Sequence, residues 1–286
     1  MRANPPNFDN FPAGESILLR RAVRFGISLN GTADTQGSGI VAGSGNGFAG
    51  IPPSDGWTAH HEVEVECQGT PDPVTGYLIG IQEVDAAVRA RLRPLLASLL
   101  ASRDRPTPSC AVGLLARSLE GTLPPTAVVT ELAWRPGPFV THTWRRTMPD
   151  HAILAERFEF SAAHRLHCPD LSDAENRKTF GKCNHPSGHG HNYRVEVAVL
   201  VGTGAGAAPF TSATLESVVN RVVIDRFDHK HLNVDCPEFE RLNPSVENIA
   251  RVCHALLAPA TEAAGAALHR VTVWETEKTS ATYPAQ

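Results

Sequence analysis

One order of expected strands and helices occurs twice along this chain, and this repetition limits the possible folds more than any other feature of the sequence. In the second half, alternating apolar and polar residues predict strands, and apolar residues three and four apart predict helices. Two strands, two helices and two further strands are expected at residues 157–161, 193–199, 214–223, 249–257, 270–275 and 279–283. Ser245 precedes the second helix at a position typical of a helix N-cap.

The first half shows the same order in weaker form. Its expected elements lie at residues 17–25, 61–67, 82–100, 108–119 and 127–131. Two copies of one α+β unit account for this agreement, and two unrelated α+β domains are the alternative. The repetition predicts domains at 1–150 and 151–286, joined by a linker at about 145–155.

Composition narrows the class of protein. The 286 residues are 42% hydrophobic, which is enough for a substantial core, and the net charge is only -4. Because the basic residues form no stripe interleaved with aromatic side chains, we expect no nucleic-acid partner. The sequence shows no cleavable leader and no apolar run of membrane-spanning length, so we expect a cytoplasmic protein outside membranes. The six cysteines are expected to be reduced thiols, and the glycine-rich stretch 37–47 a flexible loop.

Histidines with the spacing of a metal site stand in the second half. His189 and His191 lie two residues apart at the start of an expected strand, so their side chains share one face. His164 follows the preceding strand. Three neutral imidazoles with an open fourth position are typical of catalytic zinc, although paired histidines at a strand start also occur as exposed polar residues.

Cys183 lies in a loop rich in glycine, proline and asparagine, upstream of the histidine pair and next to Lys182. A thiol near zinc and a lysine ionises more readily than a free thiol, which makes Cys183 a candidate base or nucleophile. An inert loop cysteine is the alternative. That inert role is the one we expect for the other five cysteines.

Five motifs in this half resemble, in order, those of the family of 6-pyruvoyl tetrahydropterin synthase and 6-carboxytetrahydropterin synthase. They are FSAAH at 160–164, GKCN through HGHNY at 181–193, FDHKHLN at 227–233, PSVEN at 244–248 and VWET at 273–276. The resemblance implies the T-fold, which is a four-stranded antiparallel sheet with two helices on one face. T-fold units assemble through their sheet edges into barrels, and the repetition implies a tandem T-fold with a degenerate N-terminal copy.

The resemblance also implies roles for the residues of the metal site. His164, His189 and His191 would bind zinc, and Cys183 would be the general base. The loop carrying Cys183 matches the longer spacing of the pyruvoyl-forming branch, because five residues separate the cysteine from HGH. In the carboxy-forming branch, the cysteine usually stands closer.

Four further residues receive roles in the same way. Asp228 and His229 would be relay partners of the cysteine. Glu275 would accept hydrogen bonds from the amino-pyrimidine edge of a pterin, and Glu247 is a second candidate for substrate binding. Without the resemblance, Asp228 and His229 fit a polar turn, and the two glutamates fit ordinary strand and helix-start carboxylates.

The implied reaction converts 7,8-dihydroneopterin triphosphate to 6-pyruvoyl tetrahydropterin with loss of triphosphate, which is the work of a zinc-dependent lyase. One alternative is 6-carboxytetrahydropterin synthase, which uses the same substrate on the way to queuosine. Another is a pterin- or zinc-binding module without catalysis. No nicotinamide or flavin is expected, because the pterin ring gains the electrons that the substrate side chain loses.

The first half lacks most of the corresponding residues. Leu29, Leu95 and Leu96 stand where the repeat would need a ligand histidine and the Asp–His pair, and no cysteine precedes its histidine pair. Glu131 is the expected counterpart of Glu275. We therefore expect a structural half without catalytic zinc. We also expect a homo-oligomer in which catalytic halves of different chains complete each other's sites.

Overall fold

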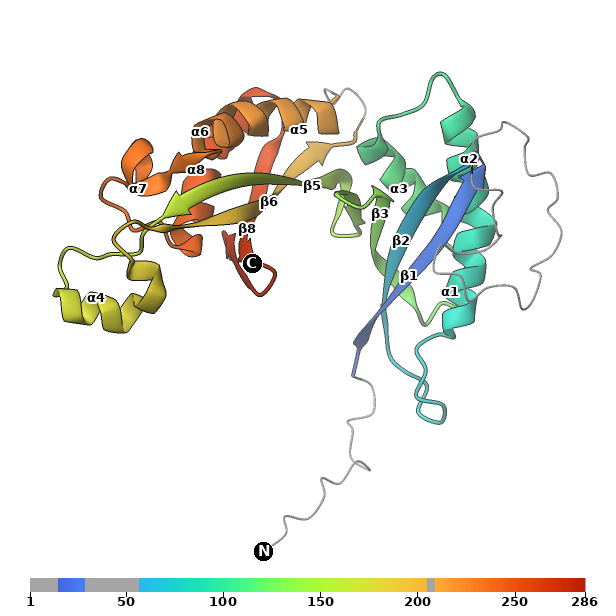
Figure 1. Ribbon diagram of the computed structural model, residues 1–286. Coiled ribbons are helices and arrows are strands. Elements are labelled where there is room, and N and C mark those ends of the chain that lie inside the picture. Colours follow the sequence, from blue (N-terminus) through green and yellow to red (C-terminus); the bar gives the residue numbers. More distant parts are fainter. Residues whose placement is uncertain (1–14, 29–56, 205–208, 286) are drawn as a thin grey trace, which may run out of the picture. The chain divides into compact units, whose positions relative to one another are not determined.

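The computed structural model describes residues 15–28, 57–204 and 209–285 (Figure 1). Leu29 and the glycine-rich stretch 37–47 lie outside the described residues. The chain forms two compact units. The first comprises Met1–Pro106, Ala111–Pro136 and Trp144–Pro149, and the second comprises Thr107–Cys110, Gly137–Thr143 and Asp150–Gln286.

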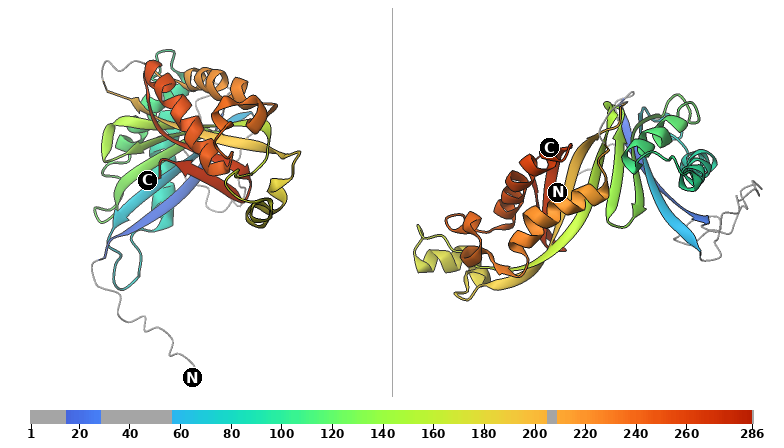
Figure 2. Two further views of the ribbon diagram at one scale, coloured as in Figure 1. Left: turned by 90° about the vertical axis from the view of Figure 1, so that its left-hand side faces the viewer. Right: turned by 90° about the horizontal axis from the view of Figure 1, so that it is seen from above.

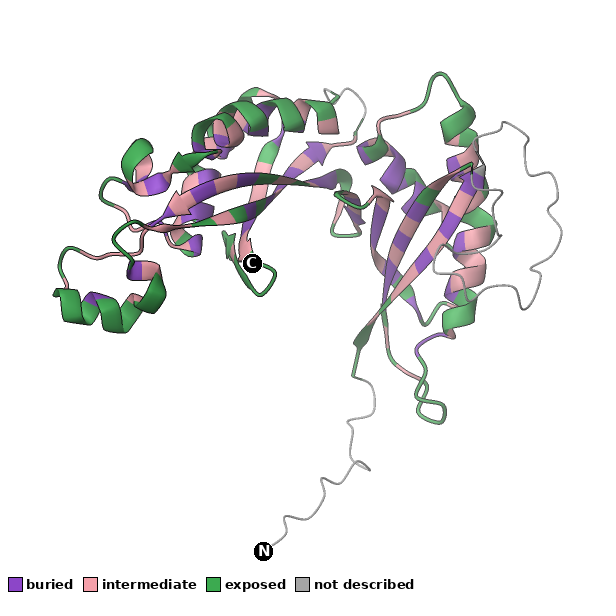
Figure 3. Cartoon of the chain, viewed as in Figure 1, coloured by how far each residue is buried: buried purple, intermediate pink, exposed green. Residues whose placement is uncertain are grey.

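Antiparallel strands form the described sheet of the first unit. Their order is β1–β2–β3, with β1 at Ile17–Ser28, β2 at Thr58–Gly69 and β3 at Val128–Gly137. Successive side chains of a strand point to opposite faces, and the alternating burial along β1 and β2 is visible in Figure 3. The buried face carries Val23, Phe25, Val63, Val65 and Leu132.

The expected helix at 82–100 is confirmed in the first unit. It consists of α1 (Ile81–Ala87), a π-helical turn (Val88–Leu92) and α2 (Arg93–Ala101). Buried residues recur every four positions, at Val84, Val88, Leu92 and Leu96. This stripe covers one helix face and packs toward β1, as the helical spacing requires. A separate helix, α3, occupies Pro108–Ser118.

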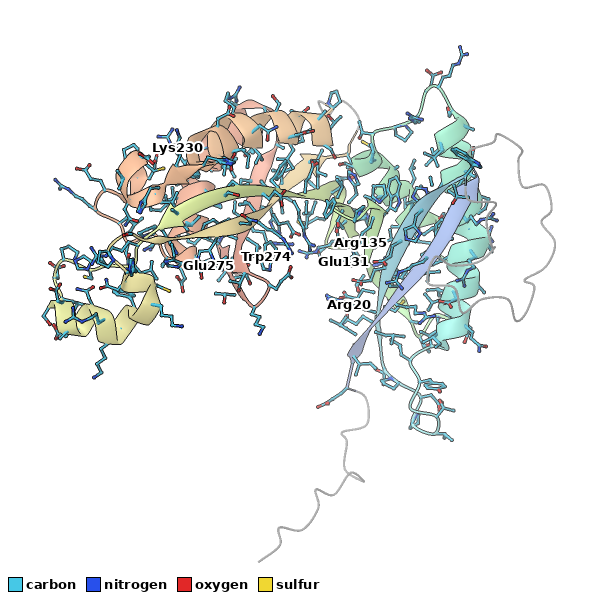
Figure 4. All side chains as sticks on the ribbon, in the orientation of Figure 1. Arg20, Glu131, Arg135, Lys230, Trp274 and Glu275 are labelled. Atoms are coloured by element: carbon cyan, nitrogen blue, oxygen red, sulfur yellow. The ribbon has the colours of Figure 1, made fainter. Side chains whose placement is uncertain are left out.

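Alternating charges cover the other face of the first sheet (Figure 4). The ion pairs join Arg20 to Glu66 at 2.7 Å, Arg24 to Glu62 at 2.6 Å, Arg135 to Glu62 at 2.8 Å and Arg145 to Glu131 at 2.7 Å. Exposed or half-exposed pairs of this kind contribute about 0–1 kcal/mol each. The apolar face therefore supplies most of the stability of this sheet.

The second unit contains the expected four-stranded antiparallel sheet. Its order is β5–β6–β8–β9, with β5 at Met148–His164, β6 at His189–Gly202, β8 at Ala267–Thr276 and β9 at Thr279–Tyr283. A two-residue strand, β7 (Lys230–His231), pairs in parallel with β5. The remaining strand, β4 (Val140–Arg145), contains residues of both units.

Helices cover one face of this second sheet (Figures 1 and 2). They are α5 (Ser212–Val219), which continues through a π-helical turn (Asn220–Ile224) into α6 (Asp225–Phe227), and α8 (Val246–Ala263). The Ser245 side chain accepts a hydrogen bond from the Asn248 N–H, so the expected N-cap is confirmed.

The core of the second unit lies between these helices and the sheet. Its members come from all layers, among them Phe160, Tyr193, Val195, Val197, Leu215, Phe227, Ile249, Leu257, Val271 and Val273. On α8 the buried residues recur at helical spacing. Apolar residues line most of β5 and β6, and histidines stand where β5 ends and β6 begins.

The expected linker at 145–155 was wrong. Residues from Met148 onward belong to β5, and their partners on β6 run from Gly202 at His151 to Ala198 at Ala155. The four residues 152–155 are all buried. Such a run lacks the alternation of a half-buried strand, which is why the sequence pattern did not reveal it.

A core substitution tests this strand assignment. Leu154 is fully buried in the core of the second unit, whereas His151 on the same strand is exposed. Leu154→Ala is expected to lower the free energy of unfolding by about 2–5 kcal/mol, because it leaves a cavity. His151→Ala is expected to change it by less than about 0.5 kcal/mol. Urea unfolding of both variants checks this, and equal, small effects would restore the linker interpretation.

Candidate metal centre and active site

The three candidate metal ligands lie at one end of the β5–β6 pair. His164 is the last residue of β5 and is directly opposite His189, the first residue of β6. His191 is opposite Ala162. Because directly opposed residues share a face, all three imidazoles project from the side of the sheet that also carries Phe160. That face is the one covered by helices.

The imidazoles converge. One ligand nitrogen from each of His164, His189 and His191 lies within 4.8 Å of the other two. The closest approach, 3.2 Å, joins Nε2 of His164 and Nε2 of His189. Ala162 opposite His191 is small, so the strand pair leaves room for the rings, whose centroids are 4.6–5.2 Å apart. Elsewhere in the described chain, no comparable group of histidine, cysteine and acidic residues is found.

Buried partners orient His164. Its Nδ1 lies 2.7 Å from the Pro244 carbonyl oxygen and 3.2 Å from the Tyr193 hydroxyl. An Nδ1–H that donates to a carbonyl leaves Nε2 with its lone pair directed at the other imidazoles, which is the usual arrangement of a metal ligand. Burial, with a smaller contribution from the nearby histidines, lowers the pKa of His164 to about 4 against the opposing effect of its hydrogen bond with Pro244, so the ring is neutral near pH 7.

The donor set fits a zinc ion. Among the described residues, Nε2 of His191 and Nδ1 of His189 are buried without a hydrogen-bond partner. Leaving such atoms unpaired costs free energy unless another group engages them. An ion bound by the three rings would engage Nε2 of His191. Three imidazole nitrogens are a common ligand set of catalytic zinc sites, and they leave a position for substrate.

Glu275 lies beside the imidazoles. It comes from β8, next to β6 in the sheet, and Figure 4 labels it near the end of that strand. Its Oε1 is 3.4 Å from Nε2 of His164 and 3.7 Å from Nε2 of His191. The side chain is 20% exposed, so the carboxylate is accessible to a ligand at the centre.

Cys183 belongs to a 3₁₀ turn (Gly181–Asn184) that follows α4 (Asp173–Phe180). The Leu166 N–H donates to the Cys183 carbonyl oxygen at 2.9 Å, and the Asn184 side chain donates to the Leu166 carbonyl at 2.7 Å. These bonds fasten the turn to the segment directly after His164.

Tyr193 is a buried neighbour of His164, because its hydroxyl lies 3.2 Å from Nδ1 of that ring. Burial raises the pKa of the Tyr193 phenol. Cys183 reaches this end of the sheet through its turn, and a role of its thiol in proton transfer stays a prediction.

Asp228 and His229 form a pair on the neighbouring segment. His229 Nδ1 is 2.7 Å from Asp228 Oδ2, and the other carboxylate oxygen accepts the Ser161 N–H at 2.8 Å. The backbone hydrogen bond from Ser161 and the contact with His229 lower the pKa of Asp228. His229 adopts φ +57°, and its side chain is 81% exposed. In the described structure, no hydrogen bond joins this pair to Cys183 or to the three imidazoles.

Glu247 lies in the first turn of α8, where it is exposed. A carboxylate at this place is stabilised by the helix dipole. No described contact connects it with the histidine centre, so its role in substrate binding stays a prediction.

Sequence reasoning gave no role to His231. This residue of β7 lies beside Ala163 of β5, and its ring contacts the loop that leads to His189. His231 belongs to the motif FDHKHLN, but a strand of two residues is too short to show the periodicity that would predict its pairing with β5. The sequence also does not predict Tyr193 and Pro244 as partners of His164, because both residues are distant from it along the chain.

The expected match of Glu131 with Glu275 depends on how the strands of the two units are aligned. If the expected strands at 61–67 and 193–199 are aligned, Val63 of β2 corresponds to Val195 of β6. The sheet registers then give the corresponding residues of β3 and β8. Val63 pairs with Trp134, whereas Val195 pairs with Val273. Trp134 of β3 therefore corresponds to Val273 of β8, and two residues further along each strand Pro136 corresponds to Glu275.

Glu131 is also already engaged, because its carboxylate binds Arg145 at 2.7 Å. It is therefore not available as the anchor of a ring in the way proposed for Glu275. Leu96, which stands at an expected position of the Asp–His pair, is fully buried in α2.

Acidification provides a test of the buried imidazole. Because folding lowers the pKa of His164 from its usual 6.5 to about 4, the unfolded chain binds the proton more readily. Stability is therefore complete above pH 6.5 and is lost as the pH falls toward 4.

The test uses metal-free protein. Between pH 7 and pH 4.5, the wild type is expected to lose about 2–3 kcal/mol more unfolding free energy than His164→Asn. Buried His61 and His142 titrate in both proteins and cancel in the comparison. Chemical denaturation at the two pH values measures the difference, and equal losses would show that His164 is not buried in its neutral form.

Comparison with known proteins gives consistent relatives for the second half. A family model described as 6-pyruvoyl tetrahydropterin synthase matches residues 153–286. The 6-pyruvoyl tetrahydrobiopterin synthase of Drosophila melanogaster is 44% identical over 100 residues, which cover 35% of this chain and 60% of that protein. A solved structure of Caenorhabditis elegans 6-pyruvoyl tetrahydropterin synthase is 33% identical, with 48% of this chain and 96% of that chain covered. Its TM-score is 0.41, too low to establish a shared fold by itself.

No described helix combines the length and the apolarity that crossing a membrane requires.

The human 6-pyruvoyl tetrahydrobiopterin synthase is 36% identical over 136 residues, which span 47% of this chain and 92% of the human protein. With that protein covered almost entirely, and with the motif histidines brought together, this chain belongs to the 6-pyruvoyl tetrahydropterin synthase family.

Proposed function

We propose that this chain is a zinc-dependent lyase that converts 7,8-dihydroneopterin triphosphate to 6-pyruvoyl tetrahydropterin with loss of triphosphate. The observation that carries the proposal is the convergence of His164, His189 and His191 in a member of this family, with the Glu275 carboxylate beside them. Neutral imidazoles and an adjacent accessible carboxylate suit a substrate that presents both hydroxyl oxygens and ring N–H donors.

The three imidazoles are proposed to hold the zinc ion. When bound, zinc acts as a Lewis acid toward side-chain oxygens of the substrate and makes the neighbouring carbon-bound protons more acidic. His164 holds its ligand nitrogen in place through the Pro244 carbonyl, so its ring does not reorient during the reaction.

Cys183 is proposed to remove a proton from the substrate side chain. Its turn is fastened to Leu166, two residues after His164. Asp228 accepts the Nδ1 proton of His229, which leaves Nε2 of His229 available to exchange a proton. We propose that this pair returns the proton to the intermediate, and that triphosphate then leaves.

Glu275 is proposed to anchor the pterin ring. A carboxylate with two free oxygens accepts two parallel hydrogen bonds from adjacent N–H groups, as the amino-pyrimidine edge provides. The strand that carries Glu275 adjoins β6, so the ring anchor and the metal ligands belong to one sheet. The ring gains the electrons that the side chain loses, and no external reductant is required.

Product identification tests the function. Zinc-loaded protein is incubated with 7,8-dihydroneopterin triphosphate, and the product is identified by mass spectrometry. We expect 6-pyruvoyl tetrahydropterin and released triphosphate, and we expect turnover to stop when a chelator removes the metal. Formation of 6-carboxytetrahydropterin would establish the alternative reaction. If the protein binds the substrate but forms no product, it is a pterin-binding module without catalysis.

Cys183→Ala tests the assigned base. The variant is expected to lose turnover by at least about 100-fold, because removal of a positioned base removes 10²–10⁴-fold of rate. It should retain one zinc per chain, since the thiol is assigned to proton transfer and not to the metal. Metal analysis and the product assay are run in parallel, with Cys168→Ala as a matched control from the same half. Loss of zinc, or unchanged turnover, would remove Cys183 from this role.

We further propose a homo-oligomeric assembly, in which barrels of T-fold units share active sites. Support comes from the exposed His229 side chain, which in the described structure makes no hydrogen bond with Cys183 or with the three imidazoles. In this proposal, residues 151–286 form the catalytic T-fold unit. Residues 1–150 are a degenerate copy with a structural role, because leucines replace the Asp–His pair there.

Mixing two inactive variants tests this assembly. Cys183→Ala is combined with His229→Asn under conditions of subunit exchange, where asparagine retains the left-handed backbone of position 229. If sites are shared between chains, mixed oligomers regain activity. Exchange demonstrated with labelled subunits, but without regained activity, would mean that each chain completes its own site.

A further inference from the structure

His231 lies at the edge of the metal centre without serving as one of its ligands. Its strand β7 pairs in parallel with β5, which places His231 beside Ala163, the residue before His164. The His231 N–H donates to Asp235 Oδ2 at 2.7 Å, so the backbone at this position is held on both sides. None of its ring atoms belongs to the group of ligand nitrogens that converge within 4.8 Å.

The ring of His231 presses against Gly188, the residue directly before His189. Gly188 has φ +69°, a conformation that side chains rarely adopt. A Cβ at this glycine would lie 2.8 Å from Nε2 of His231 and 2.8 Å from the His164 carbonyl oxygen. The Gly188 backbone therefore occupies a narrow space between the His231 ring and the end of β5.

The other ring nitrogen, Nδ1 of His231, is buried and has no hydrogen-bond partner among the described residues. The ring also lies close to the end of β5, because a Cβ at Gly188 would meet both Nε2 of His231 and the His164 carbonyl oxygen. His231 thus packs in the corner formed by the end of β5 and the start of β6. Its backbone bonds fix the point from which the ring projects toward Gly188.

We propose that His231 is a positioning residue of the metal centre, whose ring holds Gly188 against β5 and thereby directs Nε2 of His189 toward Nε2 of His164. This inference rests on the metal site of the proposed function. Without the ring, the loop before β6 gains space at Gly188, and the first residue of β6 is the one most easily displaced. The ligand geometry then loosens, although the ligands themselves remain.

The experiment measures metal binding and not only activity. Zinc affinity is determined by competition with a chromophoric chelator, and the visible spectrum of the Co²⁺-loaded protein reports ligand geometry. His231→Ala is expected to weaken zinc binding about 10- to 100-fold, the range found when supports of metal ligands are removed, and to change the Co²⁺ spectrum. His151→Ala, which removes an exposed imidazole from β5, is the matched control and should change neither.

A conservative variant and a double variant complete the test. His231→Gln fills part of the same space and is expected to recover most of the affinity. Gly188→Ala alone should weaken binding because its Cβ meets the His231 ring, and in the His231→Ala background its further effect should be smaller. Circular dichroism identifies a variant that fails to fold, in which case His231→Gln compared with His151→Ala decides.

Unchanged zinc affinity and an unchanged Co²⁺ spectrum in His231→Ala would overturn the inference, as would a wild type that binds no metal. A wild type that binds zinc but gives no pterin product would contradict the proposed function alone. In that case, the effect of His231 on metal binding still decides the positioning role.

Discussion

The antiparallel register of β5 and β6 is the constraint on which the rest of the second unit depends. It runs without interruption from the pair of His151 and Gly202 to the pair of His164 and His189. A shift by one residue would turn every side chain of one strand to the opposite face. The imidazoles would then point in different directions, and core residues such as Val195 would face solvent. Core residues that lie away from the metal ligands therefore fix the register that brings the ligands together.

Much of this arrangement follows from local sequence. Strand alternation places His189 and His191 on one face, and helical spacing after Ser245 predicts α8. What local pattern misses are segments whose structure depends on distant partners. Residues 152–155 of β5 are buried on both faces and show no alternation, so the sequence pattern does not predict a strand there. The two residues of β7 are strand only because Ala162 and Ala163 lie beside them.

The active site divides in the same way. The convergence of the three imidazoles could be predicted, because it needs only the period of a strand and the order of two strands. The supports of His164 could not, since Tyr193 and the Pro244 carbonyl reach it through the tertiary fold. The comparison of Glu131 with Glu275 meets a related limit, because a glutamate near the end of a similar strand gives no information about register.

The hydrogen bond between His164 and the Pro244 carbonyl has a thermodynamic consequence for the whole second unit. Pro244 immediately precedes Ser245, the residue that caps α8, so the first turn of this helix is tied to the end of β5. An ion held by His164, His189 and His191 would therefore cross-link two strands and one helix that are far apart in sequence. By mass action, such binding stabilises the folded state over the unfolded state and raises the melting temperature. Loss of the ion would remove this additional stabilisation from both strands and from the first turn of α8.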